Sequence, residues 1–224
     1  MPLEALRGTQ GSLTTVRDET IEAFLGQLAA RVPAPGGGAT AALHAAQSAA
    51  LLAMVARYSD GARYDAGLMG RVVTEADRLR DEALRLAEAD AEAFGAVSAA
   101  YQWPKETDEL LRARSAAIAA ALVGAAGPPA DVIRTARRLI ELAAELLPAG
   151  NRNVITDVAA AAEAARAAAV TARVNVEVNL RGIRDSAIRY RAIRAELTAT
   201  AAFTDEIIVR ADEIVAAVRD EINR

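Results

Sequence analysis

The sequence predicts an all-α protein built as a single multihelical domain, and three observations support this prediction. Alanine, the residue with the highest helix propensity, supplies 57 of the 224 residues. Aromatic residues make up only 4 % of the chain, and β-branched residues do not gather in the short alternating runs that are typical of strands. Apolar residues recur instead at intervals of three and four, the spacing that places them on one face of a helix.

We expect six to seven helices, because residues that begin or end helices recur along the chain. Thr20 is a suitable N-cap for the first helix, and Pro33 stops it. Residues 1–17 show little periodicity and are expected to form a flexible tail, which leaves 18–224 as the helical domain. The expected helices cover residues 21–32, 39–58, 68–101, 108–123, 128–147, 151–183 and 185–222.

Charge and composition exclude several classes of function. The 26 basic and 30 acidic residues give a net charge of -4, which does not favour binding to nucleic acid. The chain has no cysteine and a single histidine, His44, so a thiolate metal site is excluded and we expect no metal. The charged N-terminus does not resemble a signal peptide, and no stretch of 18 uncharged apolar residues predicts a membrane span. We therefore expect a cytoplasmic protein.

The sharpest local feature is the turn Pro35-Gly36-Gly37-Gly38, which precedes an alanine-rich helix. Glycines lack a Cβ atom, so backbone N–H groups here can approach a ligand closely. The positive end of the following helix adds to the attraction for a carboxylate, a phosphate or the edge of a heterocycle. The alternative interpretation is a tight connection between two helices, in which glycine only supplies unusual backbone angles.

A second cluster combines Asn151, Arg152 and Asn153 with Asp157 at the start of a predicted helix. Asn153 and Asp157 are four residues apart and share a helix face, and burial there would raise the pKa of the Asp157 carboxyl. The alternative is structural, with Asn151 as N-cap and Asp157 as a solvated acid of the first turn.

A third cluster contains Asn175 and Asn179, followed by Asp185. Asparagine is a poor helix former, so two of them among alternating valines need hydrogen-bond partners, for example across a subunit interface. In one straight helix, Asp157 and Asp185 would lie about 42 Å apart. They share a site only if the helix breaks or a two-fold dimer joins two chains.

Several motifs keep a defined order along nearly the whole chain. They are Ala-Arg-Val-Pro-Ala-Pro-Gly-Gly-Gly at 30–38, Arg63-Tyr64, Asp90-Ala-Glu-Ala-Phe94 with Tyr101, Pro129-Ala-Asp131-Val132, Gly150-Asn-Arg-Asn153 with Thr156-Asp157, and Asn175-Val-Glu-Val-Asn179. In this order and spacing they resemble the cyclodeaminase/cyclohydrolase family of folate enzymes.

The resemblance implies an all-α homodimer that acts on the one-carbon unit of tetrahydrofolate, with no cofactor beyond that substrate. Because no formiminotransferase domain is attached, we expect hydrolysis of 5,10-methenyltetrahydrofolate to 10-formyltetrahydrofolate. The alternative within the family is a cyclodeaminase that closes 5-formiminotetrahydrofolate and releases ammonia. A further alternative is a helical module that binds folate or forms oligomers without catalysis.

The resemblance also assigns roles to the motif residues. Asp157 is hypothesised to be the catalytic acid and base, or to hold the pterin. Arg63 stands where family members often have a lysine, and it suits carboxylate binding better than proton transfer. The residues expected to bind substrate are Pro35, Gly36, Gly37 and Gly38 lining the pocket, Asn151 and Asn153 orienting the substrate, Arg63 and Arg152 at the glutamate tail, and Tyr64, Asn175 and Asn179.

Overall fold

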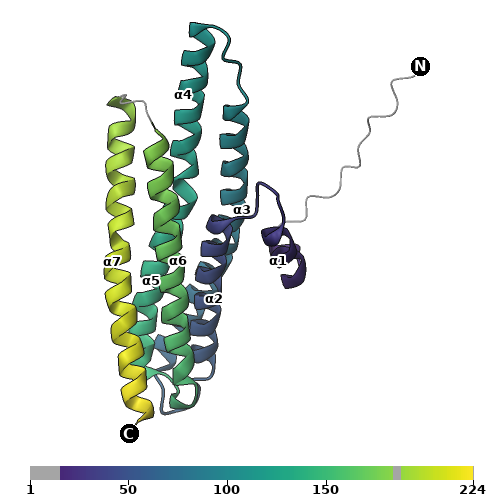
Figure 1. Ribbon diagram of the computed structural model, residues 1–224. Helices are drawn as coiled ribbons and strands as arrows, with labels where there is room; N and C mark the ends of the chain where they lie inside the picture. The colour runs from purple at the N-terminus through teal and green to yellow at the C-terminus, as the bar shows by residue number, and fades with distance from the viewer. Residues whose placement is uncertain (1–15, 184–187, 224) are drawn as a thin grey trace, which may run out of the picture.

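The computed structural model describes residues 16–183 and 188–223, and it confirms the all-α prediction. The described residues form seven α-helices and two short 3-10 turns, the turns being Val16–Asp18 and Arg152–Val154. The long helices lie side by side in an elongated bundle, with α1 at its flank (Figure 1). The helices are α1 (Ile21–Ala29), α2 (Gly37–Arg57), α3 (Ala66–Tyr101), α4 (Asp108–Ala125), α5 (Gly127–Ala149), α6 (Ile155–Gly182) and α7 (Ile188–Ile222).

The helix boundaries follow the local sequence signals with three main differences. Helix α1 ends at Ala29, three residues before the expected end at residue 32. The Thr20 side chain accepts a hydrogen bond from the N–H of Ala23 at 3.1 Å and caps α1 as expected. Helix α2 starts at Gly37 rather than at residue 39, so two of the three glycines belong to its first turn. Helix α6 starts at Ile155 and not at residue 151, because a 3-10 turn precedes it.

Helix α6 runs without a break from Ile155 to Gly182, so the alternating valines are helical. Asp185 and residues 1–15 of the expected tail lie outside the described residues. The last part of that tail, Val16 and Arg17, belongs to the first 3-10 turn, and Arg17 pairs with Glu88 of α3 at 3.2 Å.

Alanine allows the central helices to pack closely. Helix α2 is buried against α3, α5 and α6, and most of its buried side chains are alanines. At its contact with α6, the buried Ser48 hydroxyl donates a hydrogen bond to the carbonyl oxygen of Ala161 at 2.8 Å. Helix α5 supplies larger aliphatic side chains, among them the fully buried Leu139, Leu142 and Leu146. Small side chains on α2 and α6 therefore face large ones on α5. This combination fills the core while the helix axes stay close together.

Helices α3 and α4 form a hairpin that projects beyond the N-terminus of α2 and beyond the adjoining ends of α6 and α7 (Figure 1). The upper part of this hairpin therefore has fewer helical neighbours than the lower part. Several of its large apolar side chains are exposed, including Phe94, Tyr101, Trp103 and Leu111.

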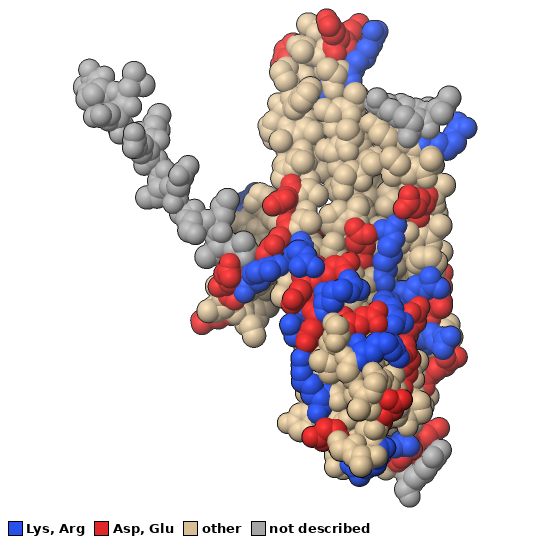
Figure 2. Space-filling view, turned by 180° about the vertical axis from the view of Figure 1, so that it is seen from behind, with Lys and Arg blue, Asp and Glu red and all other residues tan. Residues whose placement is uncertain are grey.

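The opposite, lower part of the bundle carries an ion-pair network. Seen from behind, arginines and acidic residues alternate over the lower half, whereas the upper half is largely uncharged below its tip (Figure 2). Arg138 of α5 donates two hydrogen bonds to the Glu75 carboxylate of α3, at 2.6 and 2.7 Å. Arg137 pairs with Glu206 of α7 at 3.2 Å. These pairs join three helices across the surface.

Length and composition alone would allow two segments, Gly37–Arg57 and Asp108–Ala149, to cross a membrane. This differs from the expectation that no such stretch exists. In α2, 61 % of the most apolar window is buried inside the bundle, as in a core helix. The apolar character of α2 is thus used in packing against its neighbouring helices.

Replacement of Ala165 by leucine should destabilise the protein by about 1–3 kcal/mol, because this fully buried position on α6 has no space for three more carbons. Chemical denaturation monitored by circular dichroism measures the change. Ala216→Leu, at an exposed position of α7, is the matched control and should change the free energy of unfolding by less than about 0.5 kcal/mol. Equal effects of the two variants would contradict the close packing of α6.

Hydrogen bonds from Arg138 hold the pKa of Glu75 below its ordinary value of 4.5. The pair therefore stabilises the fold above that pH, and this contribution is lost as the pH falls through the lowered pKa. Glu75→Gln should cost about 1 kcal/mol at pH 7, and this cost should shrink as the pH falls from 7 to well below 4.5. Denaturation midpoints across this pH range, compared with Glu213→Gln on the exposed face of α7, provide the measurement. A pH-independent difference would refute the role of the ion pair.

Candidate functional site

The structure divides the motif residues into two groups at opposite ends of α2. The upper group contains the glycine turn together with Asn175 and Asn179 of α6. The lower group follows the C-terminus of α2 and comprises Arg63, Tyr64, the segment 150–153 and Asp157. The 21 residues of α2 separate the groups by about 30 Å, so one chain does not bring them together.

The upper group is built around the carboxylate of Asp90 on α3, which belongs to one of the motifs but is not among the predicted site residues. A Cβ atom added to Gly38 would lie only 2.0–2.4 Å from the Asp90 carboxyl atoms, so this carboxyl rests directly on the glycine. The backbone N–H of Ala39 donates a hydrogen bond to it. Gly36, the N-cap of α2, has no side chain with which to cap the helix. Asp90 therefore satisfies a free N–H of the first turn from a neighbouring helix.

The environment of Asp90 changes its acidity. Burial between α2 and α3 raises the pKa of the Asp90 carboxyl above its ordinary value of 3.8, and the Ala39 N–H opposes this rise only in part. A carboxyl group with a raised pKa is a stronger base, and after protonation it remains able to return the proton near neutral pH.

The sequence contains a signal that identifies Asp90. The buried residues Ala76, Leu79, Ala83 and Ala87 follow each other at helical spacing along α3, and Asp90 is the next position of that stripe. An acidic residue on an otherwise apolar helix face is unusual, because burial without a partner is costly. Helix α3 also carries many exposed charged residues, so Asp90 stands out only when its position on the buried face is considered.

Two asparagines of α6 border the same region. A Cβ atom on Gly37 would lie 3.6 Å from Nδ2 of Asn175, which donates to the Thr171 carbonyl oxygen of its own helix at 2.9 Å. Asn179 donates to the carbonyl oxygen of Ala125 at the end of α4, also at 2.9 Å. Asn179 thus ties α6 to α4 within one chain.

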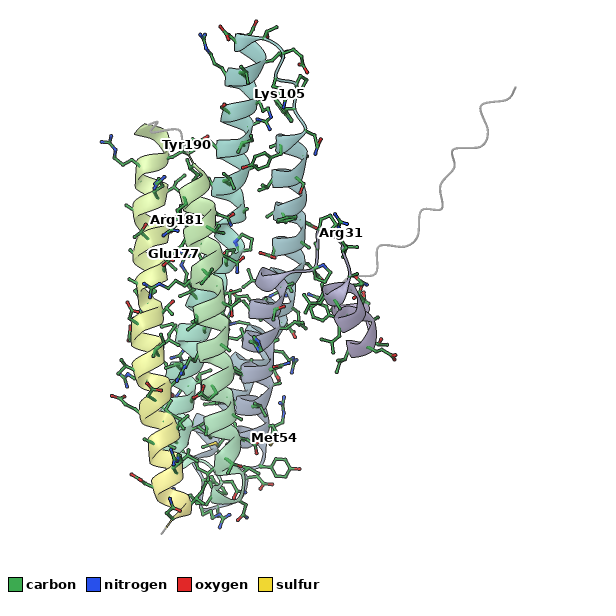
Figure 3. The ribbon with its side chains drawn as sticks, in the orientation of Figure 1. Arg31, Met54, Lys105, Glu177, Arg181 and Tyr190 are labelled. Carbon is green, nitrogen blue, oxygen red and sulfur yellow. The ribbon has the colours of Figure 1, made fainter. Side chains whose placement is uncertain are left out.

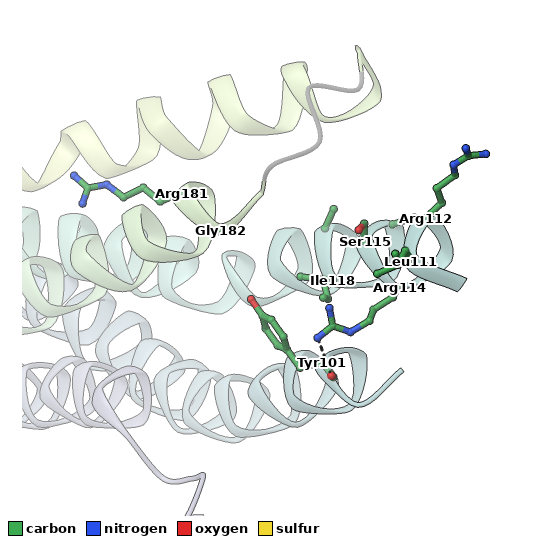
Figure 4. Close-up of a pocket in the computed structure, with 10 residues that line it drawn as sticks. Tyr101, Leu111, Arg112, Arg114, Ser115, Ile118, Arg181 and Gly182 are labelled. Carbon is green, nitrogen blue, oxygen red and sulfur yellow. Dashed lines mark hydrogen bonds between the residues drawn. The ribbon is translucent and has the colours of Figure 1, made fainter. Parts of the chain in front are cut away.

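A cavity of about 770 Å³ lies between the upper α3–α4 hairpin and the end of α6 (Figure 4). Just below it, α6 and α4 approach so closely that a Cβ atom on Gly182 would lie 2.7 Å from a methyl carbon of Leu122. The lining includes Tyr101 from α3, Arg114, Ser115 and Ile118 from α4, and Arg181 and Gly182 from α6.

The lower group lines a second, smaller pocket of about 390 Å³, formed by residues 63–65 and 148–153. The Asn151 side chain donates to the Tyr58 carbonyl oxygen at 2.7 Å and accepts from the N–H of Asn153 at 3.0 Å. The Arg63 guanidinium lies over the Tyr64 ring, 4.7 Å from its centroid. The structure thus places these motifs side by side, although 85 residues or more separate them in the sequence.

The remaining charged motif residues lie around this lower end. Arg152 pairs with Glu221 of α7 at 2.9 Å. Asp157 is half-buried in the first turn of α6, about 27 Å along the helix axis from Asn175. Its hypothesised catalytic role stays a prediction. Within the described residues, no three His, Asp or Glu side chains come close enough to hold a metal ion.

Comparison with known proteins connects this arrangement with folate enzymes. Residues 20–199 match the family model described as formiminotransferase-cyclodeaminase. The chain belongs to this family. It is 40 % identical over 174 residues to a methenyltetrahydrofolate cyclohydrolase of Methylorubrum extorquens, an alignment that covers 76 % of this chain and 83 % of the relative. The chain is therefore a folate one-carbon enzyme of the cyclodeaminase/cyclohydrolase type.

Two further relatives represent the cyclodeaminase side of the family. The formimidoyltransferase-cyclodeaminase of Rattus norvegicus is 32 % identical over 190 residues, which are 84 % of this chain but only 35 % of the rat protein. The crystal structure of a formiminotetrahydrofolate cyclodeaminase from Thermotoga maritima superposes with a TM-score of 0.80 at 26 % identity, over 92 % of this chain and 99 % of that one. The family resemblance found in the sequence motifs is confirmed.

Gly38→Ala should lower kcat/KM on the folate substrate at least about tenfold, because the new methyl group displaces the Asp90 carboxyl from the Ala39 N–H. Gly70→Ala, on α3 where an added Cβ meets nothing within 4 Å, is the control and should keep full activity. Steady-state kinetics of both purified variants test the prediction. Unchanged activity of Gly38→Ala would show that the contact between Asp90 and Gly38 has no role in catalysis.

Proposed function

We propose that this protein hydrolyses 5,10-methenyltetrahydrofolate to 10-formyltetrahydrofolate, with Asp90 as its acid and base. The observation that carries the proposal is the Asp90 carboxyl, which lies against the first turn of α2 with a raised pKa. The 40 % identity to a methenyltetrahydrofolate cyclohydrolase supports this choice of reaction. The proposed chemistry needs no cofactor beyond the folate, and we propose that it takes place in the cytoplasm.

The reaction needs one group that first accepts and then donates a proton. Water attacks the methenyl carbon, which bridges N5 and N10 and shares a positive charge with them. Ionised Asp90 accepts the proton of this water as the new C–O bond forms, and it also attracts the cationic substrate. A tetrahedral carbon results. The bond from this carbon to N5 then breaks as N5 takes the proton from Asp90. The hydroxyl on the tetrahedral carbon loses its remaining proton to solvent and becomes the formyl oxygen, so the formyl group stays on N10 and one proton is released overall.

We propose that a second copy of the chain completes the site. On α6, Val170, Val174 and Val178 form a stripe that is 39 %, 60 % and 59 % exposed, an apolar face of the kind that a partner covers. In Figure 3, the labels Glu177 and Arg181 show the upper end of α6, and Met54 shows the lower end of α2, the two ends that a partner would have to join.

A two-fold axis perpendicular to these helices would place the lower end of one chain beside the upper end of the other. Arg63, Tyr64 and Asn151 of the second copy would then approach Asp90 of the first. In that arrangement, Asp157 of the second copy suits the role of holding the pterin while Asp90 transfers protons.

The second candidate function is cyclodeamination of 5-formiminotetrahydrofolate, which the rat and Thermotoga relatives favour. In that reaction N10 attacks the formimino carbon and ammonia leaves, so the same carboxyl would move a proton from N10 to the departing nitrogen. The absorbance of 5,10-methenyltetrahydrofolate separates the two reactions, because hydrolysis consumes this compound and cyclodeamination forms it. Folate binding without either change would indicate a binding module.

Asp90→Asn should lower kcat for methenyl hydrolysis by about 100-fold or more, since the amide cannot exchange the proton. It should unfold at the same or a higher temperature near neutral pH, because a partly buried charge, disfavoured by desolvation, has been removed. In the wild type, the acidic limb of kcat/KM should have its midpoint above pH 3.8, the ordinary pKa of aspartate. Wild-type kcat in Asp90→Asn would overturn the assignment of Asp90.

Mixing two inactive variants tests the shared site. If Asp157 serves the site of the other copy, unfolding Asp90→Asn and Asp157→Asn together and refolding them should restore about a quarter of the wild-type activity, since half of the dimers then hold one intact site of two. Each variant refolded alone is the control. Sedimentation of the wild type at micromolar concentration should show a dimer. A monomer, or no recovery from two inactive variants, would contradict the shared site.

A further inference from the structure

The cavity beside the α3–α4 hairpin lies along the same face of α3 as Asp90. Tyr101 follows Asp90 by 11 residues, which is close to three full helical turns, so both side chains leave the same side of the helix about 16 Å apart. A ligand whose reacting atom lies at Asp90 therefore reaches Tyr101 only if it is long and extends along α3. This step rests on the proposed function, whose substrate joins a pterin, a p-aminobenzoyl ring and a glutamate in a line.

The cavity lining suits a ligand that is partly aromatic and partly anionic. Its described lining contains no acidic residue, although the whole chain has a net charge of -4, and among its three arginines Arg114 is the one that reaches across towards α3 (Figure 4). The uncharged part of the lining is apolar or aromatic, with Tyr101, Leu111 and Ile118 as its largest members. Positive charge beside apolar surface favours a ligand that carries a carboxylate-bearing tail beyond an aromatic ring over a neutral or cationic ligand.

One of the three arginines is held in place. The Arg114 guanidinium donates a hydrogen bond to the Tyr101 carbonyl oxygen at 3.0 Å and lies 5.6 Å from the centre of the Tyr101 ring. Its Nε is buried and has no hydrogen-bond partner within the described part of the chain. In Figure 4, Arg114 reaches from α4 towards the end of α3, whereas Arg112 points away from the cavity and Arg181 runs back along α6.

We propose that Arg114, beside Tyr101, binds the glutamate carboxylates of the folate substrate. A guanidinium fixed at one Nη keeps further donors for a carboxylate and loses little conformational freedom on binding. Arg114 is then a specificity-determining residue, which distinguishes folates with a glutamate tail from tail-less analogues without taking part in proton transfer.

The test compares Arg114→Gln with Arg112→Gln, its neighbour on the same helix, using three substrates. These are 5,10-methenyltetrahydrofolate with one glutamate, its triglutamate form, and 5,10-methenyltetrahydropteroate, which lacks glutamate. Arg114→Gln should raise KM for the triglutamate substrate about tenfold or more, leave its kcat within about twofold, and leave the pteroate kinetics unchanged. Arg112→Gln should resemble the wild type with all three.

Three outcomes would overturn the proposal. Equal KM changes of Arg114→Gln for triglutamate and pteroate substrates would show a purely structural role. A tail-dependent loss in Arg63→Gln, and none in Arg114→Gln, would place the tail at the lower pocket. A wild type with no preference for the glutamate tail would also exclude it.

A binding measurement separates this proposal from the proposed reaction. Calorimetry with tetrahydrofolate triglutamate and tetrahydropteroate needs no turnover. If the wild type does not hydrolyse the methenyl substrate but binds the triglutamate more tightly, and Arg114→Gln alone removes that preference, the tail site stands while the reaction is wrong. If the wild type binds neither compound, both proposals fail.

Discussion

The close approach of α2 to its neighbours is the constraint on which the rest of the structure depends. Alanine side chains bury α2 against α3, α5 and α6, and its Ser48 hydroxyl bonds directly to the backbone of α6. Because the helices are so close, the first turn of α2 is brought against Asp90 of α3 and Asn175 of α6. Larger side chains on α2 would move these groups apart. The alanine content that defines the composition therefore also sets the geometry of the candidate site.

Two opposing effects meet at Asp90. Burial disfavours its charged form, while the Ala39 N–H in the first turn of α2 favours it. The balance leaves the pKa raised, and the glycine at position 38 makes the contact possible because any side chain there would occupy the place of the carboxyl. The glycine turn, for which the sequence predicts close approach of a ligand, thus holds the Asp90 carboxylate of its own chain. The contact between Asp90 and the Ala39 N–H therefore caps α2 and also sets the acidity of the carboxyl proposed to transfer protons.

The two ends of the molecule have different surroundings. The lower end is tied by ion pairs among α3, α5 and α7. Its pocket is held by Asn151, which donates hydrogen bonds to the Ser59 hydroxyl oxygen and to the Tyr58 carbonyl oxygen. The upper end carries Asp90 and the cavity of the α3–α4 hairpin, with exposed aromatic side chains. Family motifs occur at both ends, and a rigid helix of 21 residues keeps them apart. This separation is the physical reason for proposing a site that two chains share.

The sequence by itself determined the all-α class, the helix order and most helix ends, because local signals such as the Thr20 cap and the alanine content act over a few residues. It also determined the family, since the order of the motifs is a property of the chain. Only the tertiary structure decided three other features. These are the contact of Arg63 and Tyr64 with residues 150–153, the distance between the two groups, and the contact of the Asp90 carboxyl with Gly38. These depend on which helix faces meet and how closely, and packing of distant segments decides that, not local preference.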